Sequence, residues 1–226
     1  MSVDGSVTQT PVPGGWSERS LTVAERTFRL VLPAQPDEFL EALAELPVEK
    51  QDHHDVYWAQ LWQAAPPTAA RILQASWPPG LEALEFGCGL GIAGLAALAA
   101  GMQVTFSDYV EFAVQTAVEN ARLNGFAHAR GEVIDWRNPP ARQWPFLFAC
   151  DVLYNQQMHE PLVSFIDAVL TADGLCWIGD AGRFHAAKFL HLANSRGFLT
   201  HIEDEHGQRL AAPHHWKFQM FVLRRK

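Results

Sequence analysis

The stretch LEFGCGLGIAGLAAL, residues 84–98, decides the fold class. An apolar run of β-strand length enters a turn with glycines at alternate positions, Gly87, Gly89 and Gly91, and small apolar residues follow. Glycine lets a turn bring its backbone close to a ligand, and the start of the following helix offers unpaired N–H groups. The stretch therefore predicts a strand, a ligand-binding turn and a helix, in that order.

Strand and helix patterns alternate through the rest of the chain, which predicts repeated βα units. Two final apolar runs leave no room for a helix between them and predict an antiparallel strand pair. We expect a Rossmann-like α/β fold, in which helices cover both faces of a mostly parallel sheet of seven strands. The expected strands are 81–86, 104–107, 132–134, 145–150, 175–179, 198–203 and 217–223, and the expected helices are 67–75, 92–100, 110–123, 158–170 and 184–195.

The sequence before this domain divides into two parts. Residues 1–20 are rich in Ser, Thr, Gly and Pro without periodicity, which predicts a mobile tail. Residues 21–51 form an N-terminal extension, with one or two short strands over 21–32 and a helix from 36 to about 46. The ligand-binding domain is expected to span residues 52–226.

Composition excludes several kinds of partner. The formal net charge of −8 argues against a nucleic-acid partner, because phosphate binding needs clustered Lys and Arg. No apolar run approaches the roughly 20 residues of a membrane span. Three cysteines without framework spacing are typical of a reducing compartment, so we expect a cytoplasmic protein. Paired histidines such as His214-His215 lack metal-ligand spacing, so no metal site is expected.

The glycine turn matches two spacing patterns. Gly89, Gly91 and Gly94 fit the G-x-G-x-x-G pattern of dinucleotide sites. Glu85 together with Gly87, Gly89 and Gly91 fits E-x-G-x-G-x-G, the pattern of S-adenosylmethionine (SAM) sites. In either case an acid at the end of the second strand is expected to meet ribose hydroxyls, and Asp108 stands there.

Two features of the sequence favour SAM over a dinucleotide. Glu85 ends the first strand, where a carboxylate would repel a pyrophosphate but suits the positive sulfonium and amino groups of SAM. Asp135 and Trp136 follow the third strand, where they are suited to accept from the adenine amino group and to stack on its ring. We therefore predict SAM as the cofactor and S-adenosylhomocysteine as its product, and we assign Gly94 to helix packing.

With these marks the chain from about Tyr57 onward resembles the seven-strand class I SAM-dependent methyltransferases. The segment D-V-L-Y, residues 151–154, is similar to the D-x-x-Y signature of the methyltransferase-16 subgroup of protein-lysine methyltransferases. That subgroup includes the enzyme that methylates the electron-transfer flavoprotein β-subunit. W-A-Q-L-W, residues 58–62, and I-G-D-A-G-R, residues 178–183, resemble further segments of the subgroup, although Ala181 replaces a proline.

The resemblance implies a site for an amine acceptor. It implies that Trp62 closes over the cofactor, that Asp151 and Tyr154 face the acceptor, and that Asp180 and Arg183 lie near the substrate. A lysine amine, with an ordinary pKa of about 10.4, must lose a proton before it attacks a methyl group. Three alternatives remain at this point: protein-lysine N-methylation, N-methylation of a small molecule as in nicotinamide N-methylase-like proteins, and a SAM-binding protein without catalysis.

Overall fold

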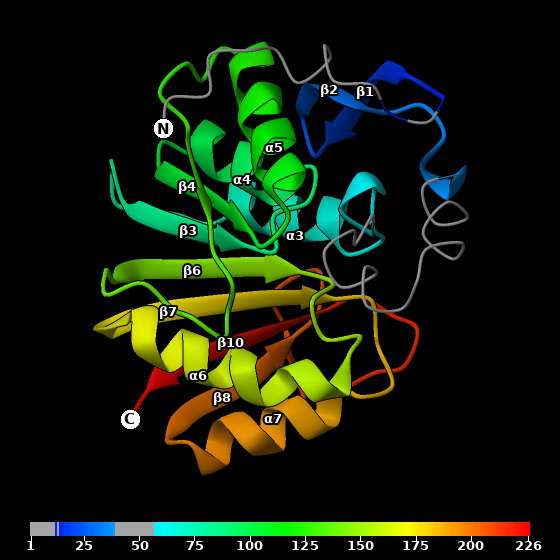
Figure 1. Ribbon diagram of the computed structural model, residues 1–226. Coiled ribbons are helices and arrows are strands. Elements are labelled where there is room, and N and C mark those ends of the chain that lie inside the picture. Colours follow the sequence, from blue (N-terminus) through cyan, green and yellow to red (C-terminus); the bar gives the residue numbers. More distant parts are fainter. Residues whose placement is uncertain (1–11, 13, 39–56) are drawn as a thin grey trace.

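The computed structural model describes residue 12, residues 14–38 and residues 57–226, and it confirms the α/β fold (Figure 1). Within these residues the central sheet has eight strands. The first five strands in the order below are parallel to one another, as the βα units predicted. The strand order is β5 (Arg130–Val133), β4 (Gln103–Asp108), β3 (Glu82–Phe86), β6 (Trp144–Cys150), β7 (Leu170–Asp180), β10 (Gln219–Arg225), β8 (Phe198–Glu203) and β9 (Arg209–Leu210).

The antiparallel C-terminal pair is also confirmed, with a more specific arrangement than the sequence predicted. Strand β10 inserts between β7 and β8 and runs antiparallel to both. The two-residue strand β9, which was not predicted, adds to the outer edge of β8. The insertion brings Gln219, the first residue of β10, opposite Asp180, the last residue of β7.

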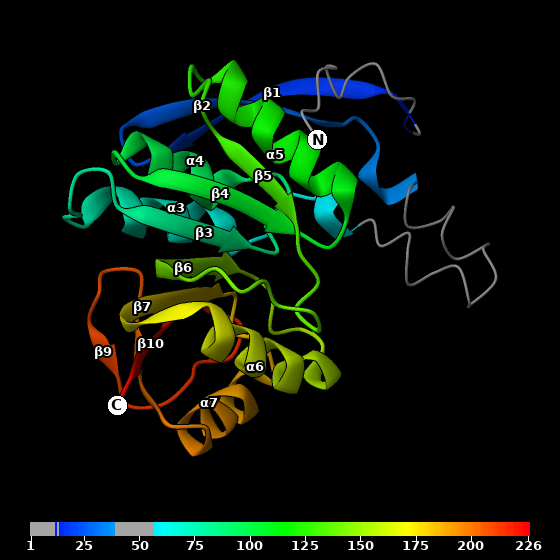
Figure 2. The ribbon, with the colours of Figure 1, turned by 60° about the vertical axis from the view of Figure 1, so that its left-hand side comes forward.

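Helices cover both faces of the sheet, as Figures 1 and 2 show. The two sides of β6 illustrate why, because Phe146 and Phe148 join one buried cluster and Leu147 and Ala149 join the other. A strand that alternates apolar side chains to both faces needs a cover on each. One cover is made by α3 (Ala65–Gln74), α4 (Ile92–Ala99) and α5 (Glu111–Leu123), the other by α6 (His159–Val169) and α7 (Ala186–Ser195).

An N-terminal β-hairpin packs outside the first helix layer, beside α5 (Figure 2). It consists of β1 (Trp16–Val23) and β2 (Arg26–Pro33), and Phe28 and Leu30 are buried in the same cluster as the helices. Strand β1 begins before residue 21, so it crosses the boundary that we predicted between tail and extension. Only residues 36–38 of the helix expected up to about residue 46 lie in the described ranges, where they are helical. None of the helices in those ranges is both long and apolar enough to cross a membrane.

Candidate active site

A cavity of about 430 Å³ opens at the carboxyl ends of β3, β4 and β6. Ligands bind at this edge of open α/β sheets, and the volume lies in the range of small-molecule sites. Of the residues expected to bind the cofactor or face the acceptor, the structure brings eight to its wall. These are Trp62, Gly87, Gly89, Asp108, Asp135, Trp136, Asp151 and Tyr154.

The glycine turn shapes the floor of the cavity. Gly87 and Gly89 have φ angles of +62° and +49°, a conformation that favours glycine. A Cβ atom on Gly87 would lie 2.9 Å from Val152 Cγ1 and 3.4 Å from Trp136 Cζ2, and both of those residues line the cavity. The absence of a side chain at Gly87 therefore keeps this part of the cavity open.

The other two glycines of the stretch lie outside the cavity wall and serve helix packing. Gly91, with φ +78°, precedes α4, and a Cβ there would lie 2.8 Å from the Cβ of Ala117 in α5. A Cβ on Gly94 would overlap the side chains of Phe106 and Glu85. The packing role predicted for Gly94 agrees with this geometry.

Glu85 points away from the cavity, toward the start of α4. Its side chain is buried, and its Oε2 accepts a hydrogen bond of 3.0 Å from the backbone N–H of Gly94. Its Oε1 is buried without a hydrogen-bond partner among the described residues. Burial raises the pKa of Glu85 well above its ordinary value, and the nearby negative charge of Asp108 adds to this effect. The predicted acid thus lies behind the glycine turn rather than at the mouth of the cavity.

Asp108 joins the end of β4 to the glycine turn. One carboxylate oxygen accepts from the Gly89 N–H at 3.2 Å, and the other accepts from the Val110 N–H at 3.1 Å. The residue is buried but lines the cavity. A carboxylate is an acceptor of hydrogen bonds, which is the chemistry that a ligand hydroxyl requires at this position.

Asp135 and Trp136 form the cavity wall beyond β5. Asp135 accepts from Arg137 Nε at 2.9 and 3.0 Å, and hydrogen bonding to Arg137 lowers the pKa of Asp135. Arg137, which no sequence motif singled out, lines the cavity as well. The Trp136 and Phe86 rings form a T-shaped pair with centroids 6.1 Å apart, so Trp136 is held from the side of the core.

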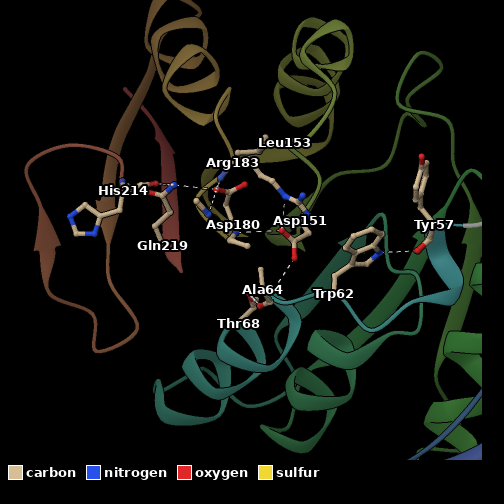
Figure 3. A network of polar contacts seen from close by, with 12 residues as sticks. Tyr57, Trp62, Ala64, Thr68, Asp151, Leu153, Asp180, Arg183, His214 and Gln219 are labelled. Atoms are coloured by element: carbon tan, nitrogen blue, oxygen red, sulfur yellow. Dashed lines mark hydrogen bonds and ion pairs between the residues drawn. The ribbon is translucent and has the colours of Figure 1, made fainter. Parts of the chain in front are cut away.

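Asp151 lies at the centre of a polar network (Figure 3). Its Oδ2 accepts from the backbone N–H of Ala64 at 2.8 Å, and its Oδ1 accepts from the backbone N–H of Ala181 at 3.4 Å and from Arg183 Nε at 3.3 Å. The side chain is only 1% exposed. The carboxylate expected to face the acceptor therefore forms an ion pair with Arg183 and hydrogen bonds with the backbone of two other segments.

Asp180 and Arg183, the two residues expected near the substrate, lie outside the cavity wall. Asp180 is fully buried and accepts from the backbone N–H groups of Gly182 and Arg183, each at 2.8 Å, and from Gln219 Nε2 at 3.1 Å. Burial raises the pKa of Asp180. These bonds fix the loop that carries Arg183, whose guanidinium lies 5.5 Å from the centroid of Trp62.

Three partly exposed aromatic side chains of the cavity wall, Tyr57, Trp62 and Tyr154, lie next to one another, and we call them the aromatic mouth. The Tyr57 ring lies 5.9 Å from Tyr154 and 6.0 Å from Trp62, and the two tyrosines are about half exposed. Trp62 Nε1 donates to the Tyr57 carbonyl at 2.8 Å. Tyr57 was not predicted as a site residue, because nothing in its local sequence pattern distinguishes an aromatic residue of the cavity wall from one of the core.

Two cysteines stand beside the motifs of the site, one in the glycine turn and one directly before Asp151. Cys88 and Cys150 line the cavity, and burial raises the pKa of both thiols well above their ordinary values. Their thiols are therefore protonated at neutral pH. The histidine pair at residues 53 and 54 lies outside the described residues, and the part that is described holds no cluster of three or more potential metal ligands.

Comparison with known proteins identifies the family. The sequence model of the methyltransferase-16 family, described as lysine methyltransferase, matches residues 44–202, which is most of the chain. The chain belongs to this lysine methyltransferase family. Its membership confirms the resemblance drawn from the D-x-x-Y segment and the glycine turn. Family and fold together imply SAM as the cofactor.

Individual relatives of this lysine methyltransferase family member match in part. A histidine protein methyltransferase 1 homolog of Dictyostelium discoideum is 30% identical over 44% of this chain and 34% of its own length. A ribosomal protein L11 methyltransferase of Campylobacter jejuni is 40% identical over 26% of this chain and 21% of its own length. The chain thus spans about a third or less of these relatives. A TehB-like SAM-dependent methyltransferase from Corynebacterium glutamicum has the same fold, with a TM-score of 0.61, 21% identity and coverage of 86% of this chain and 100% of its own.

Proposed function

We propose that the protein transfers a methyl group from SAM to the side-chain amine of a lysine in a protein substrate. The observation that carries this proposal is the aromatic mouth, which borders the same cavity as the glycine turn and stands beside Asp151. The family match supports a protein acceptor. A long, flexible side chain such as lysine is suited to reach a cavity through a ring of aromatic faces.

The residues around the cavity fit SAM. In this proposal the open backbone at Gly87 and Gly89 and the Asp108 carboxylate hold the sugar and amino-acid parts, and Asp135 and Trp136 hold the adenine. Trp62 covers the cofactor, while Glu85 and Gly91 support the glycine turn from behind. When bound, SAM supplies an electrophilic methyl group. The protein contributes mainly positioning, which is the principal requirement of an in-line displacement.

On the acceptor side, the chain has to favour the neutral amine. An unpaired carboxylate beside the acceptor would stabilise the ammonium form and oppose methyl transfer. In the proposal, the ion pair between Arg183 and Asp151 removes that effect while keeping both groups in place. Tyr154 is then the group that contacts the acceptor, through its hydroxyl or its ring face, and Asp151, Asp180 and Arg183 act as positioning residues.

A second candidate acceptor is a protein histidine. It is favoured by one observation, the 30% identity to the Dictyostelium relative that is named for histidine methylation. An imidazole has an ordinary pKa of about 6.5, so a large fraction is already neutral at pH 7 and needs no help to lose a proton. The two acceptors therefore differ in the pH dependence of transfer as well as in the product.

The experiment is incubation of the protein with methyl-labelled SAM and a methyl-depleted bacterial lysate, followed by hydrolysis and amino-acid analysis of labelled proteins. Methyl-lysine is the expected product. Methyl-histidine would show instead that histidine, the second candidate, is the acceptor. Label found only in small molecules would overturn both in favour of a small-molecule N-methyltransferase. Binding of SAM without any transfer would leave a non-catalytic SAM-binding protein. A Tyr154→Ala variant, expected to bind SAM normally but to transfer poorly, serves as the control.

A further inference from the structure

Two loops beside the site are joined into one surface unit. One follows β7 and covers residues 181–185, and the other precedes β10 and covers residues 211–218. The backbone N–H of Trp216 donates to the Gly182 carbonyl at 3.1 Å. Gly182 has a φ of +83°, and a Cβ there would lie 2.6 Å from the Lys217 backbone nitrogen, so the two backbones are in close contact.

A buried network of hydrogen bonds holds both loops on the side of the protein interior (Figure 3). Gln219 Nε2 donates to Asp180 Oδ1 at 3.1 Å and to the His214 carbonyl at 3.2 Å, while Gln219 Oε1 accepts from the His214 N–H at 2.9 Å. Both Gln219 and Asp180 are fully buried. The backbone that carries the exposed side chains of the two loops is therefore held in place by these hydrogen bonds.

These loops expose an unusual set of side chains, Phe184, His214, His215, Trp216 and Lys217, which we call the loop patch. Trp216 is 84% exposed and Phe184 is 72% exposed, and the Phe184 ring stacks on His215 with centroids 5.8 Å apart. Trp216 also has a φ of +60°, which is strained for a bulky residue. Exposed large aromatics on a strained backbone are typical of binding surfaces.

The charge of the two loops contrasts with that of the chain. Residues 181–185 and 211–218 contain Arg183 and Lys217 together with three histidines, and they contain no Asp or Glu. Arg183 is paired with Asp151, so Lys217 carries the positive charge that these loops offer to a partner. The whole chain, by contrast, has 25 acidic and 17 basic residues. A locally cationic surface on an acidic protein is complementary to an acidic partner.

The loop patch is continuous with the aromatic mouth. Arg183 stands between Gly182 and Phe184 in the first loop, and its side chain reaches Asp151 and the face of Trp62, both of which line the cavity. A polypeptide lying across the patch would therefore pass directly beside the opening of the cavity.

We propose that the loop patch binds an acidic segment of the protein substrate, next to the residue that is methylated. The inference rests on the proposed function, because it requires a protein acceptor. Aromatic and cationic side chains also bind single-stranded nucleic acid, but the match to a lysine methyltransferase family favours a protein segment. The acidic segment supplies carboxylates for Lys217 and apolar side chains for Trp216 and Phe184.

The test measures binding of two labelled peptides by fluorescence anisotropy, without SAM. The peptides are identical except that glutamates on one side of a central lysine are replaced by glutamines. The variants are Lys217→Glu, which reverses one patch charge, and Trp216→Gly, which removes the ring while glycine tolerates the positive φ. Lys226→Glu is the matched control, because exposed Lys226 follows β10 at the opposite edge of the sheet.

The unmodified protein is expected to prefer the glutamate peptide by about tenfold at low salt, with the preference shrinking as salt is added. Lys217→Glu is expected to remove most of this preference, Trp216→Gly to weaken both peptides, and Lys226→Glu to change neither. Equal binding of the two peptides by the unmodified protein would overturn the proposal, as would equal effects of Lys217→Glu and Lys226→Glu. Tighter binding of a single-stranded oligonucleotide than of the glutamate peptide would overturn it in favour of nucleic acid. Failure of the proposed function is detected separately, because it is scored by methyl-lysine in the lysate.

Discussion

The Asp151 carboxylate accepts a hydrogen bond from the backbone N–H of Ala64 at 2.8 Å and so joins the end of β6 to the start of α3. Its other oxygen holds Arg183 and the loop after β7. One buried carboxylate thus connects three segments, two of which border the cavity. A residue with this many structural partners affects the shape of the site as well as any acceptor bound there.

Asp151→Asn tests that role. Asparagine keeps the shape of the side chain and tolerates the φ of +54° at this position. Its amide NH₂ group, however, must face another donor, either the backbone N–H of Ala64 or the guanidinium of Arg183. Because a buried charged hydrogen bond is lost, we expect the free energy of unfolding to fall by about 2 kcal/mol, measured by urea denaturation. Asp167→Asn is the control, since Asp167 pairs with Arg225 at the surface and its side chain is 55% exposed, so we expect a change below about 1 kcal/mol. Lost methyl transfer with unchanged stability would show that Asp151 acts only on the acceptor.

Asn120 of α5 connects the N-terminal hairpin to the glycine turn. It is fully buried, its Oδ1 accepts from the Val31 N–H of β2 at 2.7 Å, and its Nδ2 donates to the Leu90 carbonyl at 3.0 Å. Asn120→Ala leaves both backbone groups without partners, which we expect to cost about 3 kcal/mol of stability. Because Leu90 belongs to the glycine turn, we also expect weaker SAM binding, measured by calorimetry.

The control for this prediction is the next asparagine on the same helix face. Asn124 also bonds β2, accepting from the Arg29 N–H and donating to the Arg29 carbonyl, but it makes no bond to the glycine turn. Asn124→Ala should cost about 1 kcal/mol of stability and leave SAM affinity unchanged. An equal loss of affinity in both variants would mean that the hairpin as a whole, rather than the Asn120–Leu90 bond, supports the cofactor site.

Much of the fold could be predicted because its signals are local. Strand β6 reads W-P-F-L-F-A-C, a continuous apolar run that is expected only where a strand is covered on both faces. The insertion of β10 between β7 and β8 could not be predicted, because strand order depends on contacts distant in sequence. Seven of the eight site residues at the cavity wall lie at or just after the ends of strands, so their location was predictable from the same local pattern. The eighth, Trp62, precedes α3 and was predicted only from the family resemblance.

The orientation of Glu85 was mispredicted for a simple physical reason. Side chains alternate along a strand, and its neighbours Leu84 and Phe86 face the α6 layer. Glu85 must therefore face the α3–α5 layer together with Ala83, beneath the first turn of α4. The spacing of the motif indicated the cofactor class, while the strand alternation indicated where the carboxylate points.

The role of Gly87 in keeping the cavity open can be separated from its backbone conformation. Gly87→Ala places a Cβ against Val152 and Trp136, whereas Gly101→Ala, at a φ of +89°, meets nothing within 4 Å. Both variants should lose about 1 kcal/mol of stability, because alanine disfavours a left-handed conformation. Only Gly87→Ala should weaken SAM binding, measured by calorimetry on both proteins. Equal affinities would remove Gly87 from the cofactor site.

The buried carboxyl of Glu85 predicts a pH dependence of stability. Burial raises the pKa of Glu85 above its value in the unfolded chain, so the folded protein holds a proton that the unfolded chain releases. The resulting stabilisation is fully present below the unfolded pKa of about 4.3 and is lost as pH rises through the folded pKa. Glu85→Gln has no proton to lose and keeps an acceptor for the Gly94 N–H. The unfolding free energies of the two proteins, measured in urea across this range, should therefore be similar at low pH and diverge as pH rises, with Glu85→Gln the more stable. Parallel curves would show that Glu85 has the same pKa in the folded and unfolded states. The buried carboxylate would then have to be stabilised in its charged form by hydrogen bonds or by a nearby positive charge.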